Sequence, residues 1–143
     1  MYEHVLVPTD GSEAAGVAVR EAVDLSELTG ATVHGLYVVD ARDYSTLPES
    51  KWVGVETALE SEGESALGAV TDAAEAAGVP VRTRLRRGVP HREILDYVEE
   101  AGIDLIVMAT HGRTGLDRFL LGSVTENVIR GASVPVHVMR AGD

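Results

Sequence analysis

Four short apolar runs and a fifth, more polar run at Val79–Arg87, separated by segments with helical periodicity, constrain this chain more than any other feature of its sequence. The first and fourth runs are apolar throughout, which is typical of strands buried on both faces of a sheet. Strands that alternate with helices form a parallel sheet with right-handed crossovers, because each helix carries the chain back to the end of the sheet at which the previous strand began. The pattern therefore predicts an α/β fold in which helices flank a five-stranded parallel sheet.

The expected elements follow one another without a linker or an internal repeat, so residues 1–143 are predicted to form a single domain. The expected strands are Glu3–Pro8, Thr32–Val39, Val79–Arg87, Ile103–Met108 and Val134–Arg140. Helical spacing occurs at Ala15, Ala18, Ala22 and Leu25, from Val55 to Ala77, at Ile94, Leu95, Val98 and Ala101, and across Ser123–Arg130. The expected helix boundaries are Gly30, Gly78 and Gly102 at the ends and Pro90 at a start, with a loop at 41–53.

Composition and charge limit the classes of partner. Hydrophobic residues make up 45% of the chain, but no apolar run is long enough to span a bilayer. No signal peptide precedes the first expected strand, so a cytoplasmic location is expected. The net charge of −11 argues against binding to nucleic acid or to anionic membranes, since both are polyanions. Lys51 is the only lysine, and this acidic, lysine-poor composition favours a halophilic protein over an ordinary acidic one.

The turn Pro8–Ser12 follows the first expected strand. Ligands of open parallel sheets bind beyond the carboxyl ends of the strands, where the strand order reverses. Asp10 is therefore a candidate acceptor for hydroxyl or amino groups of a ligand, or a candidate metal ligand. The alternative is helix capping, because Asp10 or Ser12 could each cap the first helix. Asp40, which follows the second strand, is expected at the same edge.

A glycine-bearing loop follows the most apolar run and leads into the last helix. Gly112 and Gly122 would let main-chain N–H groups approach a ligand closely, and a helix N-terminus offers unpaired N–H groups to an anion. Hydroxyl groups at Ser123 and Thr125 and the charge of Arg113 would add to a phosphate site. The segment therefore predicts nucleotide binding. The alternative is a capping box over 123–126, and both can hold, because a capped helix still presents its remaining N–H groups.

Several other kinds of site find no support in the sequence. No Walker loop is present, and no Gly-x-Gly-x-x-Gly follows the first strand. The five histidines form no pair at zinc-binding spacing, and no serine occupies a nucleophile elbow. Only His111 falls in the candidate site, where a loop histidine bonded to backbone is favoured over a catalytic base. No catalytic residue is assigned, and the identity of any metal stays open.

The last expected strand carries alternating valines and contains Pro135. Proline cannot donate to a sheet ladder, so this strand is predicted to lie at an edge. An apolar edge needs cover, and pairing with a second copy of the chain supplies it. The sequence therefore predicts a homodimer formed through residues of about 134–140. The alternative is cover by loops or helices of the same chain.

Together these residues resemble the universal stress protein family over nearly the whole chain. The family's nucleotide signature, Gly-x2-Gly-x9-Gly-[Ser/Thr], here reads Ala109-x2-Gly112-x9-Gly122-Ser123. The resemblance also covers Val5–Ser12, Tyr37–Asp40 and Gly88–Pro90. It implies a Rossmann-like fold of the adenine nucleotide α-hydrolase type with strand order 3-2-1-4-5. It also implies homodimers that pair through the last strand.

The resemblance further implies a binding site for ATP, or for ADP or AMP, with Mg²⁺ or Mn²⁺ as a possible companion. Residues expected around the adenosine are Pro8, Thr9, Asp10 and Val38, and those expected at the ribose and phosphates are Ala109, Gly112, Arg113, Gly122, Ser123, Val124 and Thr125. Met108 and His111 complete the candidate set. Ala109 replaces a signature glycine, and its methyl group would clash if the backbone there had positive φ or touched the ligand.

Three functions fit these residues. The favoured function is an ATP-binding stress-response protein that acts as a nucleotide-dependent sensor or switch. The second is a slow metal-dependent ATPase, for which His111 and Asp117 are the nearest candidate bases, without a visible orienting partner. The third is a protein-interaction module that keeps the fold and binds no nucleotide, for which Ala109 is the main support. Fold alone does not separate them.

Overall fold

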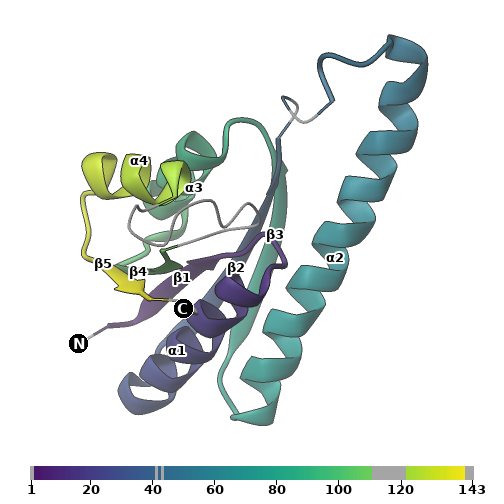
Figure 1. The fold of residues 1–143 in the computed structure, drawn as a ribbon. Coiled ribbons are helices and arrows are strands. Elements are labelled where there is room, and N and C mark those ends of the chain that lie inside the picture. The colour runs from purple at the N-terminus through teal and green to yellow at the C-terminus, as the bar shows by residue number, and fades with distance from the viewer. Residues whose placement is uncertain (1, 41, 43, 111–121, 141–143) are drawn as a thin grey trace.

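The computed structural model describes residues 2–40, 42, 44–110 and 122–140. Its five strands form one parallel sheet in the order β3-β2-β1-β4-β5 (Figure 1), which confirms the predicted fold class and strand order. The strands are β1 His4–Pro8, β2 Thr32–Val39, β3 Val81–Arg87, β4 Leu105–Ala109 and β5 Val136–Met139. As predicted from Pro135, β5 lies at an edge of this sheet, and β3 forms the other edge.

Helices cover both faces of the sheet. They are α1 Glu13–Thr29, the short 3₁₀ helix η2 Glu49–Lys51, α2 Trp52–Ala76, α3 Pro90–Ala101 and α4 Ser123–Gly131. Figure 1 shows α1 and α2 against one face and α3 with α4 against the other. The N-terminal end of α2 extends well beyond the sheet. Among the described residues, no helix is both long enough and apolar enough to cross a membrane.

The expected loop at 41–53 is wrong in its last five residues, because η2 and the first two residues of α2 occupy them. An aromatic contact stabilises this earlier start. The Trp52 indole N–H donates to the Leu47 carbonyl at 2.8 Å, and the ring packs edge-on against Tyr44. The Tyr44 hydroxyl in turn donates to Glu56 at 2.8 Å. These contacts join the segment before α2 to the start of the helix, and the spacing of apolar residues along the helix therefore does not predict them.

Three strands, β3, β4 and β5, each start two residues later than the sequence predicted. The N–H of Val79 bonds Ala74 and the N–H of Ile103 bonds Val98, so both residues close the preceding helix rather than begin a strand. β5 starts only after Pro135. The end of α1 agrees with prediction, since Gly30 has φ of 78° and its N–H bonds the Ser26 carbonyl.

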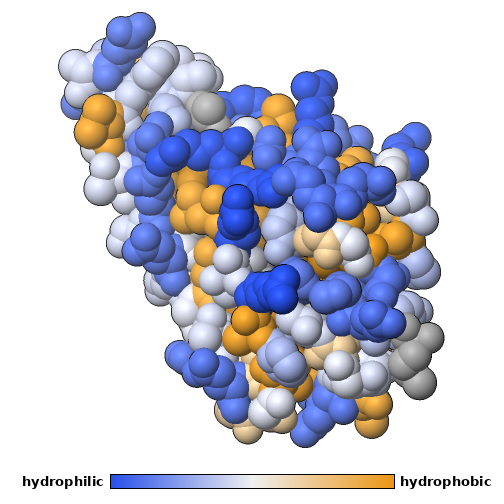
Figure 2. Space-filling view, turned by 180° about the vertical axis from the view of Figure 1, so that it is seen from behind, coloured by the Kyte–Doolittle hydropathy of each residue, from blue (hydrophilic) through white to orange (hydrophobic). Residues whose placement is uncertain are grey.

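The core consists of one apolar layer on each face of the central strand. Val5, Leu6 and Val7 of β1 are completely buried, the two valines under α1 and the leucine under α3. Hydrophilic residues spread over most of the rear face, where small apolar patches interrupt them (Figure 2). This division between interior and surface agrees with a chain that is 45% hydrophobic and carries a net charge of −11.

A glycine sets how closely α2 approaches the sheet. A Cβ atom at Gly63 would lie 2.6 Å from the Tyr37 ring and 2.8 Å from the Leu85 side chain. A Cβ atom at Gly68, further along the same helix, would meet no described atom within 4 Å. The two glycines therefore differ in how closely the sheet packs against them, while both lower the stability of the helix through the low helix propensity of glycine.

We expect Gly63→Ala to lower the free energy of unfolding, because overpacking costs about 1–3 kcal/mol and outweighs the gain in helix propensity of up to ~1 kcal/mol. Gly68→Ala should instead stabilise the protein by about 0.5–1 kcal/mol. Urea denaturation of the two variants measures both effects. Equal stabilisation by both substitutions would contradict the close approach of α2.

His34 is a buried titratable group in β2, 1% exposed. Its Nδ1 lies 2.7 Å from the Tyr97 hydroxyl and its Nε2 lies 3.1 Å from Nδ1 of His4. Burial, with further contributions from His4 and Arg82, lowers the pKa of His34 from 6.5 to about 4. The native imidazole is therefore neutral over a pH range in which the unfolded chain binds a proton.

Stability should fall as the pH drops below 6.5, because protons then bind the unfolded state in preference to the native state. From pH 7.5 to pH 5 the loss attributable to His34 is about 2 kcal/mol. Urea denaturation at a series of pH values measures this loss. In His34→Gln the pH dependence over the same range should shrink by that amount, and an unchanged slope would contradict the assignment.

Candidate functional site

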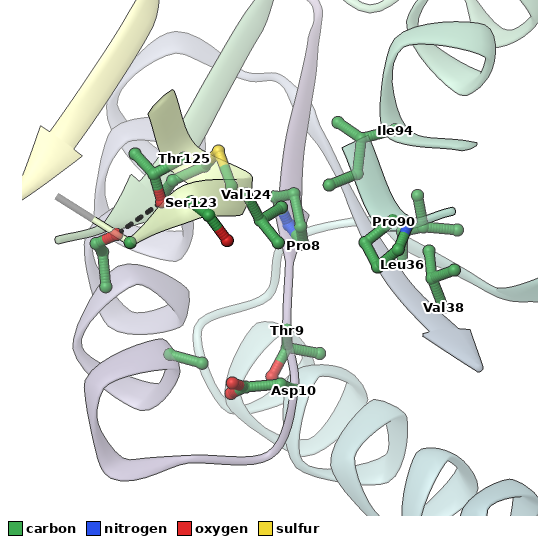
Figure 3. A pocket seen from close by; sticks show the side chains of 14 residues that line it. Pro8, Thr9, Asp10, Leu36, Val38, Pro90, Ile94, Ser123, Val124 and Thr125 are labelled. Carbon is green, nitrogen blue, oxygen red and sulfur yellow. Dashed lines mark hydrogen bonds between the residues drawn. The ribbon is translucent and has the colours of Figure 1, made fainter. Parts of the chain in front are cut away.

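A cavity of about 280 Å³ opens at the carboxyl ends of β1 and β4, where the strand order reverses. Figure 3 shows side chains from four parts of the chain around it: the turn after β1, the end of β2, the start of α3 and the start of α4. Its lining consists of Pro8, Thr9, Asp10, Ala15, Leu36, Val38, Pro90, Ile94, Met108, Ala109, Gly122, Ser123, Val124 and Thr125.

The turn after β1 is held by its own polar groups. The N–H of Thr9 donates to the Leu36 carbonyl at 2.9 Å, which extends the pairing with β2. The N–H of Gly11 donates to the Thr9 hydroxyl at 3.1 Å, and φ of Gly11 is 81°. The Asp10 carboxylate accepts from the N–H of Ser12 at 3.0 Å. Because glycine adopts this backbone without strain, the turn places the carboxylate at the cavity wall.

Ser12, rather than Asp10, caps α1. The Ser12 hydroxyl accepts from the N–H of Ala15 at 3.1 Å, and Glu13 is the first helical residue. Asp10 precedes the cap by two residues and lies beside Thr9 at the cavity (Figure 3). Of the two capping alternatives in the sequence, the structure selects the serine, so capping does not account for Asp10.

The N-terminus of α4 receives no side-chain cap from the described residues. Gly122 occupies the capping position and Ser123 is already the first helical residue, so the predicted capping box over 123–126 is wrong. The first intrahelical bond runs from the N–H of Glu126 to the Gly122 carbonyl. The N–H groups of the first turn therefore have no carbonyl to bond within the helix, and the positive end of the helix dipole lies at the cavity.

Two hydrogen bonds join the start of α4 to the end of β4. The N–H of Gly122 donates to the Thr110 carbonyl at 2.7 Å. The hydroxyl of Thr125, 5% exposed, donates to the Ala109 carbonyl at 3.0 Å (Figure 3). The Thr125 proton is thus used within the protein, and this side chain anchors the helix rather than donating to a ligand.

Ala109 has an ordinary backbone. Among the described residues, no residue other than glycine has positive φ. Ala109 pairs with Met139 as a regular residue of β4. The first reason for which alanine would disturb this position, a left-handed backbone, is therefore absent, and only contact with a ligand remains as a possible effect of its methyl group.

The opposite wall of the cavity is apolar. Leu36 and Val38 come from β2, and Pro90 and Ile94 come from the first turn of α3 (Figure 3). Sequence reasoning missed Ala15, Leu36, Pro90 and Ile94. Leu36 was accessible through strand alternation, since it lies two residues before Val38 on the same face of β2. The α3 residues follow from tertiary packing, for which the sequence carries no signal.

Ten of the predicted site residues lie in the described part of the chain, and all ten line this one cavity. They are Pro8, Thr9, Asp10, Val38, Met108, Ala109, Gly122, Ser123, Val124 and Thr125. His111, Gly112 and Arg113 lie outside the described residues, as does Asp117. The structure therefore brings together residues separated by more than a hundred positions, while their role in binding stays a prediction.

Asp40 follows β2 as expected, but it is not one of the described residues that line the cavity. Its carboxylate accepts from Arg42, with the closest guanidinium contact at 2.7 Å. The hydrogen bond with this guanidinium lowers the pKa of Asp40 below its usual value. Within the described ranges, no group of three or more potential metal ligands is present.

Comparison with known proteins places this geometry in a family. The profile of the universal stress protein family matches residues 1–140. Universal stress protein MJ0531 of Methanocaldococcus jannaschii is 41% identical over 141 residues, which span 98% of this chain and 83% of that protein. The solved structure of MJ0577, from the same organism, has a TM-score of 0.89 at 34% identity and covers 100% of this chain and 99% of that one.

A third comparison agrees with these two. The structure of the universal stress protein UspA from Lactobacillus plantarum has a TM-score of 0.83 at 30% identity and covers 97% of this chain and 98% of that one. Sequence and fold thus match over almost the full length. The chain belongs to the universal stress protein family.

Proposed function

We propose that this protein binds an adenine nucleotide, ATP in the first place, in the cavity between β1, β2, α3 and α4. One observation carries the proposal: the same cavity is lined by an apolar wall, by a helix N-terminus that no described side chain caps, and by a fixed carboxylate. A nucleotide has a part that suits each of these three, namely a flat apolar base, anionic phosphates and a sugar that carries hydroxyl groups.

The apolar end suits the base. A planar ring that enters this part of the cavity would lose water from its faces to apolar side chains, those of Leu36, Val38, Pro90 and Ile94. Asp10 then lies within the same cavity as an acceptor for sugar hydroxyl groups, since its position is fixed by the N–H of Ser12. This assignment agrees with the adenosine role that the family resemblance implies for Pro8, Thr9, Asp10 and Val38.

The start of α4 suits the phosphates. Its first-turn N–H groups, belonging to Ser123, Val124 and Thr125, have no partner within the helix and point with the dipole toward an anion. The Ser123 hydroxyl adds a donor at the same place (Figure 3). In a chain of net charge −11, such local donors, together with a divalent cation such as Mg²⁺ or Mn²⁺, offset the repulsion of a polyphosphate.

Two more distant structures show the same fold and were solved with nucleotides. A universal stress protein in complex with cAMP is 24% identical to this chain, and one from Archaeoglobus fulgidus in complex with dAMP is 21% identical. Likeness at this level shows the fold alone, so the proposal depends on the residues of the cavity. The biological role that we propose with it is a nucleotide-dependent stress sensor that acts as a cytoplasmic homodimer paired through β5.

The nucleotide content of freshly purified protein tests the proposal directly. Denaturation releases any bound nucleotide, and chromatography identifies and counts it. Intact ATP at about one molecule per chain would support the proposed site, and recovered ADP or AMP would point to turnover or to a different preference. If no nucleotide is recovered, and titration with ATP and Mg²⁺ also gives no binding, the proposal fails and the interaction-module alternative is favoured.

Gly122→Val should abolish ATP binding while the protein stays folded. The backbone at Gly122 has φ of −62°, which any residue adopts, and a Cβ atom there would meet only the Thr110 carbonyl at 3.4 Å among the described atoms. The added side chain therefore meets no severe clash with the described residues, but it occupies the approach of a phosphate to the helix N-terminus. We expect at least about a tenfold loss of affinity, equivalent to ~1.4 kcal/mol or more, by isothermal titration.

Gly54→Val is the matched control for this variant. It makes the same substitution in α2, where a Cβ atom would meet nothing within 4 Å in the described part of the chain. Its affinity for ATP should equal that of the unmodified protein. Normal ATP affinity in Gly122→Val would count against a phosphate at the start of α4.

A further inference from the structure

The edge of the sheet opposite β5 carries the densest positive charge of the chain. Four of the 12 basic residues lie within β3, at Arg82, Arg84, Arg86 and Arg87, in a protein of net charge −11. β3 is the last strand on this side of the described sheet. Arg82, Thr83 and Arg84 are exposed, so no other described element covers this part of the edge.

The four arginines fall into two pairs. Arg86 forms two hydrogen bonds with Glu100, at 2.9 and 2.8 Å, and lies over the Tyr97 ring at 5.1 Å. Arg87 pairs with Glu60 and Glu56 of α2. Arg82 and Arg84 form no ion pair with a carboxylate within the described part of the chain. Arg84 acts on Glu100 only at longer range: the hydrogen bond from Arg86 is the main cause that lowers the pKa of Glu100, and the charge of Arg84 adds to it.

The strand register shows which groups face outward. The N–H of Val33 bonds the Pro80 carbonyl, and the N–H of Gly88 bonds the Val39 carbonyl. Because bonding residues alternate along a parallel strand, the even-numbered residues of β3 direct their main chain toward β2. The odd-numbered residues Val81, Thr83 and Leu85 therefore direct their N–H and C=O groups toward the open edge.

The side chains alternate in the same way. Arg82 and Arg84 are paired in register with His34 and Leu36, so they lie on the α3 face of the sheet. There they border an open hollow that is also lined by His34 and Tyr97, both buried, and by Glu100, which is held by Arg86. The edge thus offers outward-facing main-chain groups at every second residue, and between them two guanidinium groups that form no ion pair with a described carboxylate.

We infer that this edge is a docking site for an extended acidic peptide, which adds to β3 as a sixth strand. Carboxylates at every second residue of such a peptide repeat at roughly 6.6–6.8 Å, the same repeat as Arg82 and Arg84 along β3. Main-chain hydrogen bonds to Val81, Thr83 and Leu85 provide the pairing, and the two arginines select the charge and the register. This site lies on β3 and is independent of the proposed nucleotide cavity.

Two alternative roles for the arginines are outcomes of the test. Charged residues on an edge strand also serve only to prevent aggregation, in which case no peptide binds. A single-stranded nucleic acid presents negative charges at a comparable spacing. Nucleic acid is disfavoured because the chain is acidic overall and Tyr97, the aromatic residue of the hollow, is 7% exposed and offers no face for a base.

The experiment uses the full chain and a labelled heptapeptide, acetyl-Glu-Thr-Glu-Thr-Glu-Thr-Glu-amide, at low salt. Fluorescence anisotropy should give a Kd on the order of 100 μM that weakens as salt is added. A peptide with glutamine at each glutamate, and one with the four glutamates in a block, should bind at least about tenfold more weakly. Absence of binding, or equal binding of an oligothymidylate of the same charge, would overturn the proposal.

A double variant and its control separate this edge from the general charge of the protein. Arg82→Gln with Arg84→Gln should weaken peptide binding about tenfold or more. Arg20→Gln with Arg130→Gln changes the net charge equally at exposed positions of α1 and α4 and should leave Kd unchanged. Equal losses in both double variants would show a diffuse electrostatic effect and would contradict a site on β3.

Strand addition has a second readout that charge alone does not move. Two peptides N-methylated at alternate residues present their blocked amides on opposite edges. One should lose binding and the other should keep it, because only one edge of the peptide faces β3. Equal binding by both peptides would overturn strand addition, and it would do so whether or not the protein binds ATP.

Discussion

The complete burial of β1 is the constraint on which the rest of this structure depends. A strand whose three central side chains are fully inaccessible needs a hydrogen-bonding partner on each side and an apolar layer on each face. β2 and β4 supply the partners, and α1 and α3 supply the layers. Because β2 and β4 lie on opposite sides of β1, the strand order reverses at β1, and this reversal opens the cavity at its carboxyl end.

Three helix N-termini border that cavity, those of α1, α3 and α4, and the sequence treats the starts of α1 and α4 differently. α1 receives a side-chain cap from Ser12, which satisfies part of its first turn. α4 has a glycine, Gly122, at its capping position and receives no side-chain cap from the described residues, although Thr125 holds its first turn against β4. Thr125 thus fixes the position of α4, while no described side chain caps the N–H groups of its first turn. A ligand with negative charge is the natural completion of such a helix start.

The fold was predictable from the sequence, because the period of the apolar residues reports burial directly. Strand order came from the family resemblance, since order is set by contacts between distant elements. The candidate site was predictable where it is local, as in the Asp10 turn and the signature at Gly122. The site was not predictable at Pro90 and Ile94, whose place in the cavity wall depends on how α3 packs. Within the fold, the start of α2 was not predictable either, because the contact between Trp52 and Tyr44 outweighs the local sequence signals there.

The two edges of the sheet have opposite chemistry, and this difference bears on symmetry. Edge β5 is half-buried and valine-rich, whereas edge β3 displays two arginines that form no ion pair with a described carboxylate. Two copies that join like edges form a closed pair, but copies that join β5 to β3 would repeat head to tail without limit. That second contact would place the arginines of β3 beside the valines of β5, which offer no carboxylate to pair with them. In the described part of the chain, the unlike edges therefore disfavour head-to-tail growth of the sheet.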